Sequence, residues 1–176
     1  MAERLWADNA EDMRHIGAAL ASVLQAGDLI VLDGPLGAGK TTLTQGIGEG
    51  LGVRGRVTSP TFIISRIHPN NAGLPLVHVD AYRLGDVEEV DDLDLEALLA
   101  DGVMVVEWGE GKVEALSPNR LHLTISRALQ AGGTQIHNAD EGRRIVELHT
   151  TGERWEAVDM AQVFAPYLQN IDEAGA

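Results

Sequence analysis

Three short and mostly apolar runs stand out along the chain, at residues 29–32, 76–80 and 103–108. Runs of this length, without the alternation of a half-exposed strand, are typical of strands buried on both faces of a parallel sheet. Residues 69–73 hold one Pro, two Asn and one Gly, and they predict a hairpin turn between a strand at 62–67 and the run at 76–80. A short edge strand is also expected at residues 4–6.

Two segments carry apolar residues at the spacing of an amphipathic helix. The first is expected to begin at a capping box formed by Asp8 and Glu11 and to continue to about residue 25, before Gly27. The second is expected to run from Thr41 to about residue 51, where a glycine stops it. The apolar positions that define the two helices are Met13, Ile16, Leu20, Val23 and Leu24, followed by Leu43, Ile47 and Leu51.

After residue 118 the pattern changes to the alternation of half-exposed antiparallel strands, at residues 121–126, 134–137 and 143–149. Apolar residues from Arg154 onward then predict a terminal helical region, which Pro166 kinks or interrupts. The elements together predict an α/β fold with a mainly parallel central sheet flanked by helices, a C-terminal antiparallel meander and a terminal helix. We expect one domain over residues 1–176, with its core at about 5–127 and the meander and terminal helix at about 120–170.

Residues 34–42 contain the pattern G-x-x-x-x-G-K-[ST], at Gly34, Gly39, Lys40 and Thr41. The pattern lies between a predicted buried strand and a predicted helix, and this context distinguishes a phosphate-binding P-loop from a chance match. Backbone N–H groups would cup the phosphates of a nucleotide, Lys40 would reach the β- and γ-phosphates, and the Thr41 hydroxyl would bind Mg²⁺. The residues expected to contact the nucleotide are Gly34, Leu36, Gly37, Ala38, Gly39, Lys40, Thr41 and Thr42.

Two of the predicted strands end in a carboxylate, Asp80 and Glu107. Ligands meet an α/β sheet at the carboxyl ends of its strands, so both are candidates for the nucleotide site. Glu107 is favoured as the second protein ligand of Mg²⁺ beside Thr41, and Asp80 is expected to serve catalysis by organising the metal or the attacking water. A capping role for Asp80 is the alternative. Trp108 belongs either to the core or beside the nucleotide.

Residues 57–62 are polar for a segment that enters a strand, and Pro60 would present the hydroxyl groups of Thr58, Ser59 and Thr61 together. This position, after the first helix of a P-loop protein, is where switch loops that respond to the nucleotide usually lie. An ordinary turn rich in Ser and Thr explains the same spacing equally well.

The chain has a net charge of −14 over 176 residues. Phosphate contacts supply most of the non-specific affinity for nucleic acids, so strong direct binding of RNA or DNA is not expected. Seven of the eleven residues 86–96 are acidic and predict a solvated helix face, with a docking surface for a basic partner as the alternative. Leucines would form the inward face of that helix, namely Leu93, Leu95, Leu98 and Leu99.

Several classes of protein are excluded by what the sequence lacks. There is no cysteine, and hence no disulfide framework, thiolate zinc site or thiol nucleophile. No apolar run approaches the ~18 residues of a membrane span, and the N-terminus lacks the plan of a signal peptide, so a cytoplasmic protein without membrane contact is expected. The histidines have no metal-ligand spacing and are interpreted as surface or strand residues: His15, His68, His78, His122, His137 and His149.

Four motifs occur in a fixed order: the P-loop at 34–42, Ser-Pro-Thr-Phe at 59–62, His-Val-Asp-Ala-Tyr-Arg-Leu at 78–84, and Val-Glu-Trp at 106–108. In this combination the chain closely resembles the TsaE (formerly YjeE) family of small bacterial ATPases of tRNA threonylcarbamoyladenosine biosynthesis. The resemblance covers about residues 5–127, and four ordered motifs are far more specific than a P-loop alone. Pro35 departs from the family, which often has an acidic residue there, at a position that contributes mainly its backbone.

The resemblance implies a P-loop domain that binds ATP and Mg²⁺ and hydrolyses ATP weakly alone and faster with the TsaB–TsaD pair. It implies a part in modifying the adenosine beside the anticodon of tRNAs that read codons beginning with adenine. Carried onto this sequence, it places Lys40, Asp80 and Thr61 in catalysis, the last of these in the switch loop. It also places Thr41 and Glu107 on Mg²⁺, and Trp108 beside the nucleotide.

Two other functions are compatible with a P-loop. A small-molecule kinase would normally carry an arginine-rich lid over the phosphates, whereas the segment between the P-loop and the run at 103–108 has only the scattered arginines Arg54, Arg56, Arg66 and Arg83. A nucleotide-sensing module that never hydrolyses would need fewer carboxylates than the pair Asp80 and Glu107. The sequence therefore favours an ATPase that acts on tRNA modification through protein contacts.

Overall fold

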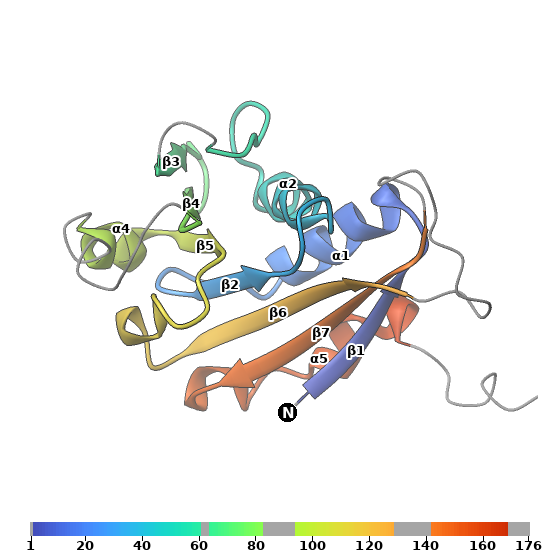
Figure 1. Ribbon diagram of the computed structural model, residues 1–176. Helices are drawn as coiled ribbons and strands as arrows, with labels where there is room; N and C mark the ends of the chain where they lie inside the picture. The colour runs from blue at the N-terminus through green and yellow to red at the C-terminus, as the bar shows by residue number, and fades with distance from the viewer. Residues whose placement is uncertain (1, 61–63, 83–93, 129–141, 169–176) are drawn as a thin grey trace, which may run out of the picture.

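The computed structural model describes residues 2–60, 64–82, 94–128 and 142–168. Seven strands form one sheet in the order β1-β7-β6-β2-β5-β4-β3 (Figure 1). The strands are β1 (Ala2–Ala7), β2 (Leu29–Asp33), β3 (Ser65–His68), β4 (Leu76–Asp80), β5 (Val103–Glu107), β6 (Arg120–Arg127) and β7 (Arg144–Thr151). The four central strands β6, β2, β5 and β4 are parallel, and the outer strands are antiparallel. This confirms the predicted α/β fold.

Helices cover both faces of the sheet, because alternate residues of each central strand point to opposite faces. Ile30 and Leu32 of β2 belong to the apolar cluster that holds α1 and α2, whereas Leu29 and Val31 belong to the cluster that holds α4. Figure 1 shows α1 and α2 lying side by side and α4 apart from them. The helices are α1 (Ala10–Ala21), α2 (Lys40–Leu51) and α4 (Leu95–Asp101), with the short turns η1 (Glu114–Leu116), η2 (Glu153–Trp155), α5 (Met160–Val163) and η3 (Ala165–Tyr167).

Helix α1 differs at both ends from the prediction. Its N-cap is Asn9, whose side chain accepts a hydrogen bond of 2.9 Å from the backbone N–H of Asp12. The carboxylate of Asp12 in turn accepts from the N–H of Asp8, so the capping pair is shifted by one residue from the predicted Asp8 and Glu11. The helix ends at Ala21, short of the predicted residue 25, because the chain continues through consecutive turns instead.

Glycines let α1 and α2 approach so closely that backbone meets backbone. A Cβ atom on Gly46 of α2 would overlap the carbonyl oxygen of Arg14 in α1, and one on Gly17 of α1 would overlap the carbonyl oxygen of Leu43. Neither helix can yield without moving its main chain. This contact fixes α2, whose first residues belong to the P-loop, against the body of the protein.

Gly46→Ala is therefore expected to lower the free energy of unfolding by about 2–3 kcal/mol, despite the better helix propensity of alanine. Gly48→Ala is the matched control in the same helix, because there the added methyl meets side-chain atoms of Val57 at 2.6 Å and Val53 at 3.2 Å, which can shift. Denaturant unfolding measures both. Equal losses in the two variants would contradict the backbone contact.

The C-terminal strands join the main sheet. β6 has the predicted alternation of buried and half-exposed residues, yet it pairs in parallel with β2 on one side and antiparallel with β7 on the other. The strand predicted at 143–149 is β7, and the edge strand predicted at 4–6 is β1, which pairs with it. The strand predicted at 134–137 lies outside the described residues.

The terminal helical region consists of three short segments, η2, α5 and η3, and Pro166 lies in the last of them. Buried Trp155, Met160 and Phe164 anchor these segments in the cluster of α1 and α2. Of the predicted acidic helix, only α4 is described, with Leu95 and Leu99 buried and Leu98 partly buried; residues 86–93 lie outside the described part. None of the helices that the structure describes is long and apolar enough to cross a membrane.

Candidate nucleotide-binding site

Three neighbouring parallel strands bring the candidate residues to one edge of the sheet. In the register of the sheet, Leu32 of β2 pairs with Glu107 of β5, and Glu107 pairs with Asp80 of β4. The P-loop follows β2 directly, so the loop, Asp80 and Glu107 meet at the carboxyl ends of the strands. The candidate residues at the ends of three separate apolar runs therefore lie together in one site.

The P-loop ends in a helix terminus that no side chain caps. The N-cap of α2 is Gly39, with φ 111°, and it makes no side-chain capping hydrogen bond. Gly34 and Gly37 also have positive φ angles of 147° and 74°, and a Cβ on Gly34 would overlap the carbonyl oxygen of Ile125. The first-turn N–H groups of a 12-residue helix are therefore presented by a loop that only glycines can form, which is an anion-binding arrangement.

Lys40 lies folded across this loop. Its ammonium group donates hydrogen bonds to the carbonyl oxygens of Gly34, at 2.7 Å, and Pro35, at 3.1 Å, and it lies 4.0 Å from the centroid of the Trp108 ring. Burial lowers the pKa of Lys40 below its usual value, and the charges of Glu107, Asp33 and Asp80 oppose this shift. A cation held among carbonyl groups and a ring face is positioned to receive an anion.

Glu107 is 4% exposed and contacts two side chains through one oxygen. Its Oε1 accepts a hydrogen bond from the Thr41 hydroxyl at 3.2 Å and lies 3.0 Å from Nε2 of His78. Thr41 is the second residue of α2, so the contact joins the helix to the end of β5. The structure thus brings together the two residues predicted as metal ligands.

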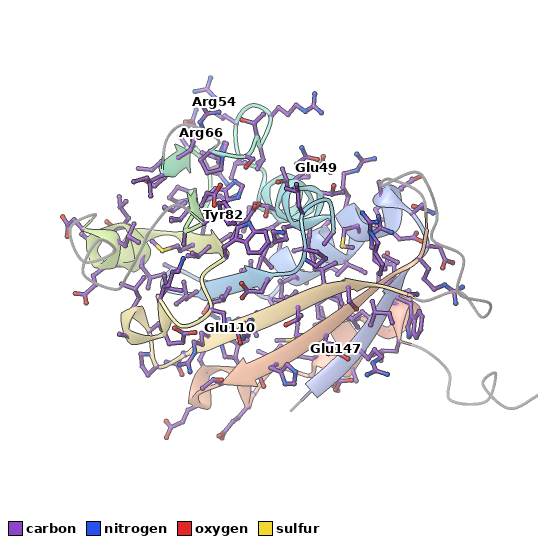
Figure 2. The ribbon with its side chains drawn as sticks, viewed as in Figure 1. Glu49, Arg54, Arg66, Tyr82, Glu110 and Glu147 are labelled. Carbon is purple, nitrogen blue, oxygen red and sulfur yellow. The ribbon has the colours of Figure 1, made fainter. Side chains whose placement is uncertain are left out.

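Two aromatic rings line the site. Trp108 has a left-handed backbone with φ 60°, which is unusual for a tryptophan, and its N–H donates to the carbonyl oxygen of Leu32 at 2.9 Å. This conformation sends the ring towards Lys40 instead of into the core. Tyr82, which is labelled in Figure 2, is 68% exposed, and its ring centroid lies 5.2 Å from that of Trp108. Trp108 therefore lines the candidate site, the second of the two positions considered for it.

A cavity of about 690 Å³ opens over these groups. It is lined by ten predicted residues, which belong to the P-loop or to the strand ends, and by others that the sequence did not indicate. The predicted ones are Leu36, Gly37, Ala38, Gly39, Lys40, Thr41, Thr42 and Trp108, together with both carboxylates, Asp80 and Glu107. Gly34 forms the base of the loop, and its carbonyl oxygen accepts a hydrogen bond from Lys40, while Thr61 lies outside the described residues. Ser59, from the same predicted switch segment, lines the cavity.

Asp80 shows features of both roles considered for it. Its Oδ1 accepts a hydrogen bond of 3.0 Å from the backbone N–H of Tyr82, which is the capping contact of the alternative interpretation. The same side chain is half-buried and lines the cavity beside Glu107. Its second oxygen is available for a ligand without breaking the turn.

A family model described as "Threonylcarbamoyl adenosine biosynthesis protein TsaE" matches residues 7–136. The chain belongs to the TsaE family. The tRNA threonylcarbamoyladenosine biosynthesis protein TsaE of Streptomyces coelicolor is 58% identical over 151 residues, which cover 85% of this chain and 97% of that protein. The protein of the same name from Bacillus subtilis is 43% identical over 121 residues, covering 68% of this chain and 75% of its own length.

The fold is also that of a solved structure, the crystal structure of Bacillus subtilis YdiB. The two chains are 32% identical in sequence and superpose with a TM-score of 0.67. The match covers 89% of this chain and 90% of the YdiB chain. The resemblance to the TsaE family that the four motifs indicated is thereby confirmed. An alignment of 151 residues is longer than the stretch of about 5–127 that carries those motifs, so the similarity to TsaE proteins continues into the C-terminal part.

Sequence reasoning missed the wall of the cavity opposite β4 and β5. There the start of α1 contributes Asn9, Ala10 and Met13, and the start of β7 contributes Gly142 and Arg144. Arg144 is 8% exposed, and its Nε donates to the carbonyl oxygen of Ala38 in the P-loop at 3.2 Å. No local pattern indicates this contact, because it joins residues more than 100 positions apart through the pairing of β6, β7 and β1.

A second ionic group lies near the base of the P-loop. His122 Nε2 is 2.8 Å from Asp33 Oδ2, and Glu110 joins them within 4.8 Å; among the described histidines this is the one that groups with two carboxylates in this way. The hydrogen bond from Asp33 raises the pKa of His122; burial opposes the shift, and the charges of Asp33, Glu110 and Glu114 add to it. The side chains of His122 and Asp33 are 27% and 13% exposed.

A histidine whose pKa is higher in the folded state stabilises the fold fully below its unfolded pKa of about 6.5. That contribution is lost as the pH rises through the raised value. Relative to the parent, His122→Gln is expected to lose about 1 kcal/mol of stability near pH 5.5 and much less near pH 9. Its control is His149→Gln, because His149 faces His122 in the sheet and has no carboxylate partner among the described residues. A pH-independent difference for His122→Gln in urea unfolding would contradict the ion pair.

Proposed function

We propose that the protein is a Mg²⁺-dependent ATPase of tRNA threonylcarbamoyladenosine biosynthesis. The observation that supports this most strongly is the convergence of an uncapped, glycine-rich helix terminus with Lys40, Thr41 and Glu107 in one cavity. The TsaE relatives are named for that biosynthesis, and the matched region contains every one of these residues. The cavity volume of about 690 Å³ lies within the range of small-molecule sites.

In this proposal the P-loop supplies binding and charge stabilisation. The backbone N–H groups at the start of α2 bind the phosphates, and the positive end of the helix favours them. Lys40 exchanges its two carbonyl partners for phosphate oxygens, where its charge opposes the negative charge that develops during transfer of the phosphoryl group. The nucleoside then extends along the wall formed by the starts of α1 and β7.

Thr41 and Glu107 fit a Mg²⁺ ion. Neighbouring ligands of an octahedral Mg²⁺ with bonds of about 2.1 Å are about 3 Å apart, close to the 3.2 Å between the Thr41 hydroxyl and Glu107 Oε1. When bound, Mg²⁺ supplies neutralisation of phosphate charge. Thr41 and Glu107 would hold it, with the hydroxyl proton of Thr41 turned away from the carboxylate and an oxygen lone pair directed to the ion.

We propose Asp80 as the residue that orients the attacking water. One of its oxygens is held by the N–H of Tyr82, which fixes the carboxylate at the cavity wall. The other oxygen can accept a hydrogen bond from a water molecule in the cavity. A water held in this way would be aligned for attack on the terminal phosphate. Thr61, in the switch segment, is proposed to sense whether that phosphate is present.

We further propose that the ATPase is slow alone, and is stimulated by TsaB and TsaD in the cytoplasm, where tRNA is modified. The net charge of −14 supports action through proteins, because it opposes direct binding to tRNA. One sheet takes strands from both ends of the chain, Ala2–Ala7 and Arg144–Thr151, which supports a single P-loop domain over residues 1–176.

Association measurements test the proposed coupling to partners. The purified chain is mixed with TsaB–TsaD and ATP, ADP or no nucleotide, and complex formation is followed by size-exclusion chromatography. We expect the amount of complex to depend on the nucleotide, and Thr61→Ala to weaken this dependence more than it weakens ATP binding. Association that is independent of nucleotide, or tight binding of tRNA by the isolated protein at physiological salt, would contradict the proposal.

A further inference from the structure

One histidine in the middle of a buried strand is not explained by packing. His78 lies on β4 within an otherwise apolar run, and its side chain is 0% exposed. Its Nε2 has one partner, Glu107 Oε1 at 3.0 Å, and its Nδ1 has none among the described residues. A buried imidazole with an unpartnered nitrogen costs free energy that an aliphatic side chain would not, so the stability of the strand is not a reason for a histidine here.

The single partner of His78 is the carboxylate that the proposed function assigns to Mg²⁺. A carboxylate only accepts hydrogen bonds, so Nε2 is the donor and the unpartnered Nδ1 is a bare acceptor. Groups behind a metal ligand commonly orient it in this way and strengthen binding of the metal. We propose that His78 is a positioning residue, which holds the carboxylate of Glu107 towards Thr41 and so sets the affinity for Mg²⁺. This inference rests on the proposed function.

Lys40 makes such a restraint necessary. Glu107 is one of the carboxylates whose negative charge acts on the buried ammonium of Lys40. A Glu107 side chain without a fixed position would be drawn towards that cation and away from Thr41. The hydrogen bond from His78, on the neighbouring strand β4, opposes this movement.

A second buried histidine provides the matched comparison. His68 on β3 is 5% exposed, and its Nε2 also lacks a partner in the described part of the chain. It pairs with Leu76, two residues before His78, and it makes no hydrogen bond to Glu107. The two histidines therefore share burial and chemical type and lie on neighbouring strands, β3 at the edge of the sheet and β4 inside it, and they differ in the contact under test.

The experiment separates metal binding from nucleotide binding. Calorimetry measures the affinity for a non-hydrolysable ATP analogue in excess EDTA and at a series of Mg²⁺ concentrations, for the parent, His78→Leu, His78→Gln, His68→Leu and Glu107→Gln. We expect His78→Leu to bind the analogue in EDTA within about two-fold of the parent, but to require about 10- to 100-fold more Mg²⁺ for the tightening that Mg²⁺ produces. His78→Gln should recover much of the loss, because its amide N–H reaches about as far as Nε2.

His68→Leu is expected to keep the Mg²⁺ dependence of the parent, and Glu107→Gln to lose it. Thermal unfolding checks that each variant is folded; should His78→Leu not fold, His78→Asn replaces it, since its shorter amide falls short of Glu107. Parental Mg²⁺ dependence in these His78 variants, or an equal loss in His68→Leu, would overturn the positioning role and leave the proposed function intact. A parent whose analogue binding ignores Mg²⁺ would instead overturn the proposed function itself.

Discussion

Replacing Lys40 by alanine is expected to abolish measurable ATP hydrolysis, with kcat reduced about 100-fold or more, while the protein stays folded. The ammonium group donates hydrogen bonds to the P-loop carbonyl oxygens of Gly34 and Pro35. Its loss removes the cation that faces the transferred phosphate in a site with reduced access to water. Phosphate release, with thermal unfolding as the check of folding, measures both effects.

The control for this prediction is Arg54→Ala. Arg54 is an exposed residue, labelled in Figure 2, that does not line the cavity, so the variant loses the same charge from another part of the surface. We expect Arg54→Ala to hydrolyse ATP at the rate of the parent. Equal rates in the parent and in Lys40→Ala would contradict the assignment of the P-loop.

Glu107→Gln and Asp80→Asn are expected to separate metal binding from chemistry. Glu107→Gln removes the charge that faces Thr41, and the affinity for Mg²⁺ should fall by about 100-fold, at least as much as when a group behind a ligand is lost. Asp80→Asn keeps the site of Glu107 intact and should bind MgATP nearly as well as the parent, but hydrolyse it about 100-fold more slowly. Metal titrations of binding and of rate distinguish the two.

Glu110→Gln is the charge control for both variants. Glu110 follows Trp108 by two residues, is exposed and labelled in Figure 2, and does not line the cavity. The Glu110→Gln variant should retain the affinity for Mg²⁺ and the rate of ATP hydrolysis of the parent. Unchanged Mg²⁺ dependence in Glu107→Gln, together with a lost dependence in Asp80→Asn, would reverse the two assignments.

The sequence predicts the strand ends of this site well because the signals are local. Short and mostly apolar runs favour strands buried on both faces, and Asp80 and Glu107 end two such runs. Parallel pairing then places both at the edge of the sheet from which the P-loop starts. The signals for the end of α2 at Gly52 and for the alternation in β6 are local as well, and both elements occur as predicted.

Contacts between distant segments were not predictable in the same way. His78 has no sequence neighbour that indicates Glu107, since their contact depends on the register of β4 against β5. Arg144 reaches the P-loop only because β7 returns beside β6. The capping pair of α1 was misplaced by one residue because Asp8, Asn9, Glu11 and Asp12 offer two overlapping pairs, and the packing of the helix selects between them.

The most direct test of the account is steady-state ATP hydrolysis by the purified protein, with and without TsaB–TsaD, compared with Lys40→Ala under the same conditions. We expect slow release of phosphate by the protein alone and a clear increase in that rate with TsaB–TsaD. Lys40→Ala should lose phosphate release both with and without TsaB–TsaD. Hydrolysis that Lys40→Ala leaves unchanged, or rapid transfer of the phosphoryl group to a small molecule without the partner proteins, would contradict it.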